Sequence, residues 1–370
     1  MDKNLKMKIR QITIGALAVM LASCSAEKRT TQEPAAQTPA QALIARMDSV
    51  AKSGRFYFGH HDDTAYGHTW EYAEGGSDVR AVTGEYPGLM SWDLGMIELD
   101  SARNLDGVPF GFMASEIARQ DARGGINAIS WHPRNPVSGG GSWDVSTAPL
   151  AMMDSVQAVT DTLTAWIDRA ADFIGSLRDA DGNRIPVVFR PWHENSGSWF
   201  WWGAGHSTPE QYIALYRLTR ERFDSAGIDN VVWAYSPDKD LTREQYFSTY
   251  PGDEYVDILG TDIYMFDGAD GVEPYKARIA AQLPYVVEEA QKRGKLAAFT
   301  ETGSESLPVA DWYTGVLMPS IENLPIAYVC VWRNAIESQN PKHFYVPYPG
   351  HQAEADFKAF HDNPKTIFVK

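Results

Sequence analysis

Two glutamates, each close to the end of a short apolar segment, are the residues in this sequence best placed to do chemistry. Glu194 lies in the stretch 186–203, where Val187–Phe189 is followed by polar side chains, and Glu301 lies in the stretch 296–303. An apolar segment that ends in polar residues is typical of a buried strand that presents side chains at a site. Two carboxyl groups are the minimum set for glycoside hydrolysis. The pattern therefore predicts a glycosidase centre.

Four consecutive aromatic residues, Trp199 to Trp202, follow Glu194. Aromatic rings pack against the apolar faces of sugar rings, so an aromatic wall beside a carboxylate favours a carbohydrate site. The alternative is that the aromatics belong to the core and that Glu194 caps the next helix. We favour the sugar site, because four adjacent aromatics do not all face one core and because an acid between His193 and Asn195 is costly to hold for structure alone.

Eight apolar segments, each followed by polar or aromatic residues, alternate with helical stretches. The predicted strands are 56–60, 89–94, 126–132, 186–190, 231–235, 256–260, the segment that contains Glu301, and 326–331. The predicted helices include 42–54, 153–177, 209–223 and 275–293. This alternation predicts an α/β fold, a (β/α)8 TIM barrel. Glu194 after the fourth strand and Glu301 at the end of the seventh would then meet at the C-terminal mouth of the barrel.

The motifs RPWHEN, SWFWWG, DIY and FTETG resemble those of glycoside hydrolase family 26, the β-mannanases, a retaining family with a TIM barrel. The similarity runs from about Phe56 to the C-terminus. It implies cleavage of β-1,4-mannosidic linkages, with Glu194 as general acid/base and Glu301 as nucleophile. In the wider clan of retaining barrel glycosidases the acid usually follows Asn, whereas here it follows His193, as in family 26.

The resemblance implies substrate-site roles for six further residues: His132, His193, Trp199, Tyr264, Trp332 and Arg333. Tyr264 would lie beside Glu301, and His193 is the candidate for contact with the 2-hydroxyl of mannose. Trp332 would lie under the sugar being cleaved, with Arg333 at the next sugar toward the non-reducing end. Trp199 would lie on the leaving-group side. His132 would contact substrate or, alternatively, only brace its loop.

The two carboxyl groups need different ionisation states at one pH. We expect Trp192 and Trp199 to lie against Glu194 and to favour its neutral form, because an apolar environment disfavours the charge. Hydrogen-bond donors such as Tyr264 would keep Glu301 ionised. Thr300 and Thr302 flank Glu301 as possible further donors, although neighbours in a strand point the other way.

Several alternatives to an endo-acting mannanase stay open. Loops that close one end of the cleft would instead release mannobiose from the non-reducing end, and β-1,3-xylan or mixed-linkage glucan is another possible substrate. A non-catalytic glycan-binding lipoprotein is a third reading. The presence of both glutamates with His193 and Tyr264 argues against it, because a binder needs no positioned acid pair.

No metal or cofactor is predicted. The run from His60 to Asp63 contains four potential ligands, but its spacing matches no zinc motif, and adjacent residues rarely coordinate one ion together. The glycine-rich stretch 138–143 lacks the Gly-Lys-Ser/Thr ending of a phosphate loop. We interpret it as a mobile wall of the cleft that carries Trp143.

The N-terminal residues carry targeting signals. A basic start and the apolar run 12–22 predict a signal peptide over 1–23, and Leu21 to Cys24 resembles a bacterial lipobox of the Bacteroides type. The alternative is an ordinary secretory signal with an incidental cysteine. Residues 24–41 are predicted to be a flexible tether and 42–370 the catalytic domain. Lipidation at Cys24 predicts attachment to the outer membrane. The lack of an acidic run after Cys24 favours the periplasmic face over the cell surface.

The net charge of −15 argues against nucleic acid as a partner and suits a neutral substrate such as mannan. Cys330, the only other cysteine, lies in an apolar run and is predicted to be a buried core residue. With Cys24 lipidated, no disulfide is expected. We expect the protein to be a monomer.

Overall fold

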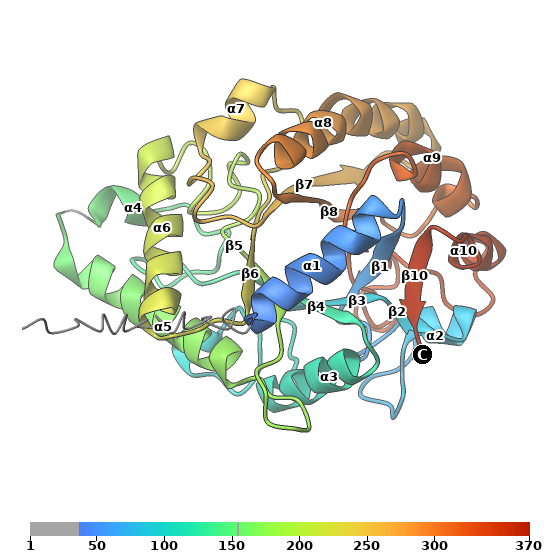
Figure 1. Ribbon diagram of the computed structural model, residues 1–370, viewed down its shortest axis with the longest axis horizontal. Helices are drawn as coiled ribbons and strands as arrows, with labels where there is room; N and C mark the ends of the chain where they lie inside the picture. Colours follow the sequence, from blue (N-terminus) through green and yellow to red (C-terminus); the bar gives the residue numbers. More distant parts are fainter. Residues whose placement is uncertain (1–36, 154) are drawn as a thin grey trace, which may run out of the picture. The chain divides into compact units, whose positions relative to one another are not determined.

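Eight parallel strands close into a barrel in the computed structural model, which describes residues 37–153 and 155–370. The barrel strands are β1 (Phe56–His61), β3 (Leu89–Asp93), β4 (Ile126–Trp131), β5 (Val187–Pro191), β6 (Val231–Tyr235), β7 (Ile258–Met265), β8 (Leu296–Ser304) and β9 (Tyr328–Val331). Each strand pairs with the next, and β9 pairs back with β1 from Tyr57 opposite Tyr328 to His60 opposite Val331. The predicted TIM barrel is therefore confirmed (Figure 1).

Helices cover the outside of the barrel between successive strands (Figure 1). The longer ones are α3 (Phe110–Ala122), α5 (Gln157–Ser176), α6 (Pro209–Ser225) and α8 (Val272–Lys292). The shorter ones are α2 (Asp78–Thr83), α4 (Pro149–Met152), α7 (Arg243–Ser248), α9 (Met318–Ile321) and α10 (Glu354–His361). Short helical turns are η1 (Ile97–Leu99), η2 (Gly268–Gly271) and η3 (Trp312–Leu317). The helix predicted over 153–177 begins later, at Gln157, because Val156 has an extended backbone.

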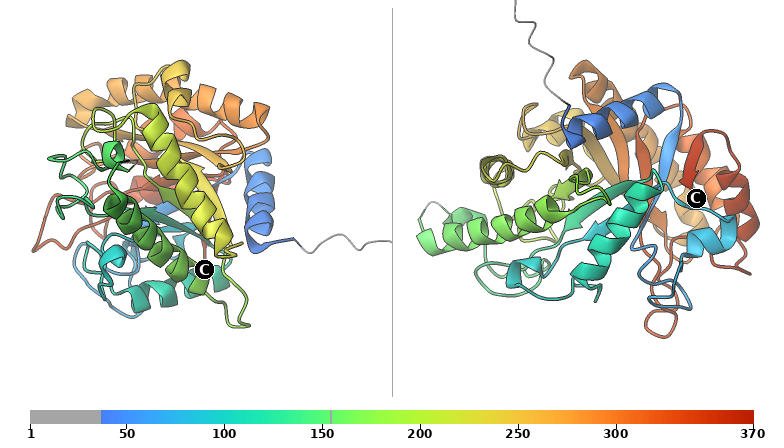
Figure 2. Two further views of the ribbon diagram at one scale, coloured as in Figure 1. Left: turned by 90° about the vertical axis from the view of Figure 1, so that its left-hand side faces the viewer. Right: turned by 60° about the horizontal axis from the view of Figure 1, so that its bottom comes forward.

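Helix α1 (Pro39–Lys52) lies across the end of the barrel at which the strands begin (Figures 1 and 2). Its buried Leu43 and Met47 pack with the lower interior of the barrel, which includes Tyr57, Val188 and Val232. Helix α1 therefore covers the end of the barrel at which the strands begin. The opposite end, where the strands finish, is left for the functional site.

The start of α1 corrects the predicted end of the tether. Thr38 and Gln41 form a capping box, and Pro39 stands in the first turn, so 39–41 is helix rather than tether. The composition of this segment suggested a flexible chain, but the Thr-Pro-x-Gln pattern is a helix start signal. Gly54, predicted as the stop, follows the helix with a φ of 74°, a conformation that favours glycine.

Strand β7 is longer than predicted and reaches Met265 instead of ending at Gly260. Its pairing with β8 shifts register between Thr261 and Asp262, which is a bulge, and then continues with Asp262 opposite Glu301. Bulges next to active sites re-aim side chains. Two short strands outside the barrel, β2 (Tyr86–Pro87) and β10 (Thr366–Val369), extend the sheet beside β1.

The predicted signal peptide, Cys24 and most of the predicted tether lie outside the described residues. Within the described ranges, no helix has both the length and the apolar character needed to cross a membrane. Cys330 is a free, buried cysteine, as predicted.

Candidate active site

The two glutamates lie at the ends of strands on opposite sides of the barrel. Glu194 is in the turn after β5, and Glu301 is in β8. Trp192 and Glu194 both have left-handed backbones, with φ of 54° and 52°. Such conformations cost on the order of 1–3 kcal/mol for non-glycine residues and are concentrated at functional sites. The Glu194 N–H donates to the carbonyl of Ser236 at 2.8 Å, which anchors the turn to the next strand.

Burial raises the pKa of Glu194 well above its usual range, and the negative charges of Glu301 and Asp262 raise it further. The protonated acid therefore persists to higher pH than in a free glutamate. Glu301, in contrast, is held by two donors: the Arg190 guanidinium pairs with Oε2, and the Tyr264 hydroxyl donates to Oε1 in a short hydrogen bond. The structure thus places Tyr264 beside Glu301. It surrounds Glu194 with groups that disfavour its charge and gives Glu301 a positive partner.

Arg190 is itself fixed by Asp262, whose Oδ2 accepts from Nη1 at 2.7 Å. The remaining oxygen of Asp262 accepts from the Thr300 hydroxyl at 2.7 Å. The side chains of Thr300 and Thr302 bond other groups than Glu301, because they point to the other side of the strand. Burial opposes the charge of Arg190, but Asp262 and Glu301 raise its pKa above the ordinary value.

Trp199 stands beside Glu194, but its effect is the reverse of the one expected. The indole Nε1 donates to Oε2 of Glu194 at 2.7 Å, and this hydrogen bond lowers the pKa of the carboxyl, while burial is what raises it. Trp192 is a core residue: it packs against Trp131 and Trp202, and its Nε1 donates to Thr219.

The aromatic run is only partly a wall of the site. Trp199 is 36% exposed, whereas Phe200, Trp201 and Trp202 are buried in the core. Our argument that four adjacent aromatics cannot share a core was therefore wrong for three of them. The chain turns sharply after β5, and these rings fill the space behind the site. Phe200 still contributes there, because its ring contacts His132 and His193.

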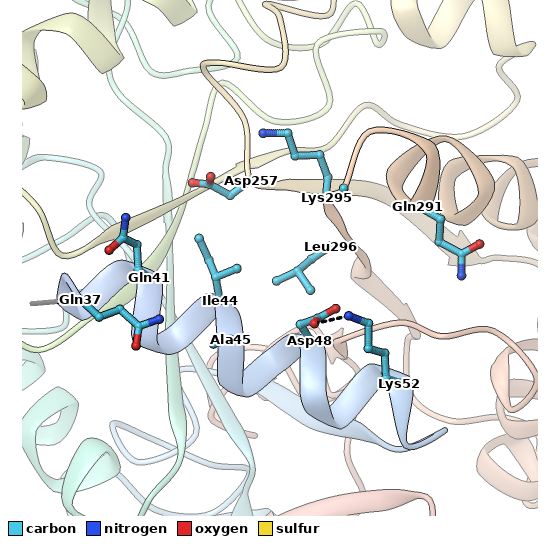
Figure 3. Close-up of a pocket in the computed structure, with 11 residues that line it drawn as sticks. Gln37, Gln41, Ile44, Ala45, Asp48, Lys52, Asp257, Gln291, Lys295 and Leu296 are labelled. Carbon is cyan, nitrogen blue, oxygen red and sulfur yellow. Dashed lines mark hydrogen bonds and ion pairs between the residues drawn. The ribbon is translucent and has the colours of Figure 1, made fainter. Parts of the chain in front are cut away.

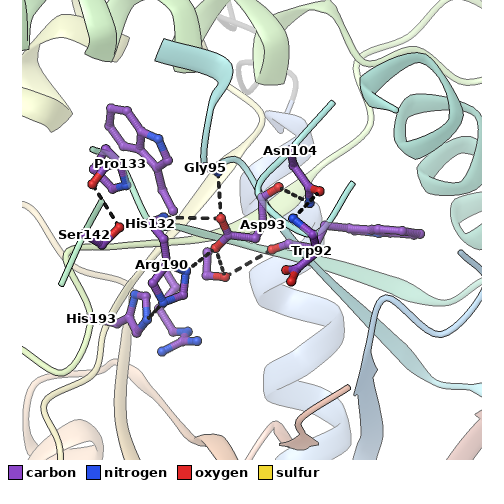
Figure 4. A network of polar contacts seen from close by, with 12 residues as sticks. Trp92, Asp93, Gly95, Asn104, His132, Pro133, Ser142, Arg190 and His193 are labelled. Atoms are coloured by element: carbon purple, nitrogen blue, oxygen red, sulfur yellow. Dashed lines mark hydrogen bonds and ion pairs between the residues drawn. The ribbon is translucent and has the colours of Figure 1, made fainter. Parts of the chain in front are cut away.

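A chain of three residues runs from β3 to the turn that carries Glu194 (Figure 4). Asp93 accepts from Nδ1 of His132 at 2.6 Å, and the Nε2 atoms of His132 and His193 lie 3.1 Å apart. Trp143, at 56% exposure, stacks on His132 with ring centroids 5.4 Å apart. Trp143, which the sequence placed in a wall of the cleft, therefore stacks on His132, a predicted substrate contact.

The end of β9 brings Trp332 and Arg333 to the same end of the barrel. The indole of Trp332 stacks on His61, with ring centroids 4.2 Å apart and planes at 22°. Arg333 pairs with Asp106 at 3.0 Å, and its Nη1 lies 3.3 Å from the Tyr66 hydroxyl. Of the six predicted binding residues, Trp199 and Tyr264 bond the two glutamates directly, His132 and His193 contact each other, and Trp332 and Arg333 follow β9.

One group of potential metal ligands in the described part of the chain is His61, Asp62 and Asp106, whose ligand atoms lie within 4.8 Å of one another. Our expectation that neighbouring residues do not share an ion overlooked Asp106, which comes from a separate loop. Arg333 already brings a positive charge to Asp106, and Tyr66 donates to Asp62 at 2.6 Å. The protein therefore already supplies a positive charge to Asp106 and a hydrogen-bond donor to Asp62.

We expect hydrolysis to be unaffected by prolonged treatment with a chelator. The reason is that the sequence assigns the chemistry to Glu194 and Glu301, while Arg333 already pairs with Asp106 of the His61 group. The measurement is the rate on mannan before and after EDTA and dialysis, with added Ca²⁺, Mg²⁺ or Zn²⁺ in parallel. A loss that one of these ions alone restores would contradict the prediction.

A separate cavity of about 690 Å³ lies at the other end of the barrel, between α1 and the start of β8 (Figure 3). Asp48 and Lys52 form an ion pair on its α1 side. The side chains that line it include no aromatic platform, and active sites of TIM barrels lie at the opposite end. We assign it no part in the chemistry.

Three acidic residues of the site were given no role from the sequence: Asp93, Asp106 and Asp262. Asp93 was visible at the end of a predicted strand and Asp262 within the DIY motif. Their positions near strand ends indicated a possible role in the site. Their partners lie in strands that are distant in the sequence, so no rule based on residue spacing could identify that role. Arg190 was visible in the sequence as part of the polar cluster at the end of the fourth strand. Its role became clear only when the structure placed it against Asp262 and Glu301.

Replacing Asp262 with alanine should lower the free energy of unfolding by about 1–3 kcal/mol, because the buried donors of Arg190 and Thr300 lose the carboxylate that accepts from them. Arg190 keeps Glu301, but its Nη1 loses the carboxylate. Urea unfolding of the variant measures the effect. Asp270→Ala, an exposed aspartate of η2, is the matched control. Equal stability of the two variants would show that Arg190 does not need Asp262.

Comparison with known proteins gives one consistent result. The family model described as glycosyl hydrolase family 26 matches residues 32–313. A GH26 β-mannanase from Bacteroides ovatus has a solved structure that is 46% identical, with a TM-score of 0.86, and the match covers 90% of this chain and 95% of that one.

Two curated relatives carry the name mannan endo-1,4-beta-mannosidase. One, from Bifidobacterium adolescentis, is 30% identical over 346 residues, which is 88% of this chain and 34% of the relative. The other, from Bacillus subtilis, is 29% identical over 271 residues, which is 70% of this chain and 68% of the relative. The chain therefore spans about a third of the length of the first relative and about two thirds of the second.

Proposed function

Because the chain belongs to glycosyl hydrolase family 26, we propose that it is a retaining endo-β-1,4-mannanase that acts on mannan, galactomannan or glucomannan. The observation that carries the proposal is the contrast between the two glutamates. Burial and neighbouring charges raise the pKa of Glu194, while Arg190 and Tyr264 bond the two oxygens of Glu301. A positioned acid and a positioned nucleophile are what double displacement at a glycosidic carbon needs.

In the first step the Glu301 carboxylate forms a bond to the anomeric carbon as the glycosidic bond breaks. Glu194 gives its proton to the departing oxygen, so the leaving chain emerges as a neutral alcohol. In the second step Glu194, now ionised, takes a proton from water. The water oxygen bonds to the anomeric carbon, and Glu301 leaves as a carboxylate. The two inversions restore the original configuration.

The surrounding residues have roles that fit this chemistry. Trp199 is bonded to the acid and would contact the leaving-group sugar, while Trp332 would lie under the sugar that is cleaved. His193 adjoins Glu194 and would bind the axial 2-hydroxyl of mannose, supported by His132. Arg333 would hold the next sugar toward the non-reducing end. Hydrogen bonds to the 2-hydroxyl strengthen in the oxocarbenium-like transition state, so this contact favours reaction as well as binding.

The first product of hydrolysis should be the β-anomer, because two displacements at the same carbon retain configuration. Proton NMR during the first minutes of mannohexaose cleavage measures this before mutarotation. A sample left until the anomers equilibrate gives the reference ratio. An initial excess of the α-anomer would exclude Glu301 as a covalent nucleophile.

A second product pattern, release of mannobiose from the non-reducing end, is favoured by one observation. The segment after β9 that contains Arg333 is tied to neighbouring loops: the Glu337 N–H donates to the His68 carbonyl at 2.7 Å, and His68 stacks on Tyr348. With the Arg333–Asp106 pair, these contacts join loops from three strands on the side assigned to the non-reducing end. A fixed wall there would limit how many sugars fit beyond the cleavage point.

A time course of products separates these patterns. Linear mannan and galactomannan are digested side by side with β-1,3-xylan and mixed-linkage glucan. A ladder of oligosaccharides from the start supports endo action, and mannobiose alone from the start supports the second pattern. Preferred cleavage of xylan or glucan would replace the proposed substrate. Binding of mannan without any cleavage would leave the non-catalytic alternative.

We also propose that the protein is a monomeric lipoprotein of the outer membrane, anchored through Cys24 and facing the periplasm. The lipobox-like end of the signal segment supports the anchor, and a multiply acylated cysteine holds a protein stably at a membrane. Protease treatment of intact cells is the test. Digestion would place the protein on the surface, and its release into the soluble fraction by Cys24→Ala would support the anchor.

A further inference from the structure

The inference concerns the three-residue chain Asp93–His132–His193 (Figure 4). Asp93 is surrounded by donors: Oδ1 accepts from the N–H of Gly95 at 2.6 Å and of His132 at 3.3 Å, and Oδ2 accepts from the Ser130 hydroxyl at 2.8 Å. Burial alone would raise the pKa of Asp93, but His132 and these donors lower it overall. Asp93 is thus a carboxylate that only accepts hydrogen bonds.

This fixes the protonation of His132 at one nitrogen. Its Nδ1 lies 2.6 Å from Oδ2 of Asp93 and must carry a proton, because the carboxylate has none to give. Its other nitrogen, Nε2, faces Nε2 of His193 at 3.1 Å. Two imidazole nitrogens at this distance share one proton, since two N–H groups would repel and two lone pairs would form no bond.

We propose that Asp93 is a positioning residue that acts through His132 to set the tautomer of His193. When His132 is neutral, its Nε2 accepts, so His193 carries its proton on Nε2. When His132 takes up a proton, its Nε2 donates, so His193 carries its proton on Nδ1. The two rings hold two protons in the first state and three in the second. The change is the net uptake of one proton.

His193 is built to stay neutral through this change. Burial lowers its pKa well below the usual value, and the charges of Arg190 and His132 lower it further. Its Nδ1 is buried and has no hydrogen-bond partner among the described residues, so no contact at that nitrogen fixes which tautomer it adopts. The contact with His132 therefore decides which tautomer His193 adopts.

Charged groups from several strands face the pair. Burial lowers the pKa of His132, but Asp93 raises it above the usual value, with a smaller contribution from Glu301. Arg190 on β5 and His61 on β1 act in the other direction. Asp106 also interacts with His132. Among the charged neighbours, Asp93 has the largest effect on the pKa of His132. Removing the charge of Asp93 should therefore shift the pH at which His132 titrates.

The consequence for substrate rests on the proposed function. If His193 contacts the sugar 2-hydroxyl, it does so through Nδ1, because Nε2 faces His132, and its tautomer decides whether Nδ1 accepts from that hydroxyl or donates to it. Asp93, which is buried and does not reach that contact itself, would then control recognition of mannose through two imidazole rings. The coupling of the two tautomers rests on the geometry alone and can be tested without any turnover.

The test is imidazole ¹⁵N NMR of the full-length chain, because the two nitrogens have different shifts in each tautomer. Spectra of His132→Gln and His193→Gln assign the two rings among the nine histidines. On lowering the pH, His193 should change from Nε2–H to Nδ1–H at the same midpoint at which His132 becomes charged. A single tautomer of His193 throughout the titration of His132 would overturn the proposal.

Asp93→Asn supplies the second arm. Loss of the adjacent charge should lower the shared midpoint by about 1–3 pH units. Ser130→Ala is the matched control, because it removes another donor from Oδ2 but keeps the charge, and its two rings should still change together. An unchanged midpoint in folded Asp93→Asn would also reject the proposal.

Activity gives an independent readout. In the wild type, kcat/KM on mannotetraose should show an ionisation at the NMR midpoint, and in Asp93→Asn it should move with that midpoint. At fixed pH the variant should lose about 10- to 100-fold, the size expected when the partner that orients a functional histidine is removed. Coupled tautomers without this ionisation would reject the substrate role of His193. A wild type that cleaves no mannan would reject the proposed function instead.

Discussion

Glu301→Ala is expected to lower kcat on mannan by at least about 10⁴-fold, comparable to the loss of a nucleophile in other covalent mechanisms. Without the carboxylate no glycosyl-enzyme bond can form, and no other described acid is held by both Arg190 and Tyr264. The rates of wild type and variant on mannopentaose measure the effect. The fold should survive, because Arg190 keeps its bond to Asp262.

Azide separates the loss of the nucleophile from general damage to the site. A small anion can enter the space left by the Glu301 side chain and attack the sugar directly, and this single displacement inverts the configuration. An α-mannosyl azide from an activated aryl mannoside would therefore identify Glu301 as the nucleophile. Glu210→Ala, an exposed residue of α6, is the control for handling and should behave as wild type. Near-normal mannan hydrolysis by Glu301→Ala would refute the assignment.

The positions of the two glutamates at the strand ends could be predicted from the sequence because they depend on a local pattern. Each glutamate follows a run of apolar residues, and eight such runs alternate with helices, which fixes the barrel and its mouth. Local start signals mattered too: the cap at Thr38 marks the first helix, and reading composition alone misplaced that boundary by a few residues. The boundary of a helix depends on single residues, whereas the fold depends on a pattern formed by many residues.

The environment of the pair could not be predicted in the same way, because it is made by distant residues. Arg190 bonds Asp262, 72 positions away, and Glu301, 111 positions away. A bulge in β7 sets Asp262 opposite Glu301, and no composition rule locates a bulge. The aromatic run shows the same limit. Only the path of the chain after β5 decides that Trp199 bonds Glu194 while the next three rings enter the core.

The raised pKa of Glu194 makes its role testable through pH. Burial, together with the charges of Glu301 and Asp262, disfavours its ionised form. The group must be protonated to assist departure of the leaving group, so activity on mannan should fall as the pH rises through this raised pKa. We therefore expect Glu194 to produce an alkaline limb in the rate profile. A variant without the carboxyl should have no such limb.

Glu194→Ala should lower kcat on mannan by about 10²–10⁴-fold, the usual contribution of a general acid. An aryl mannoside with a good leaving group needs little protonation, so its first step should persist and the glycosyl-enzyme should accumulate, seen as a burst of released phenol. Added azide should then speed turnover and give the β-mannosyl azide, because it attacks the intermediate from the side that water uses. The same variant should have a flat rate profile on the alkaline side. Equal losses on mannan and on the activated substrate, with no burst, would show that Glu194 is not the general acid. Another group near Trp199 would then have that role.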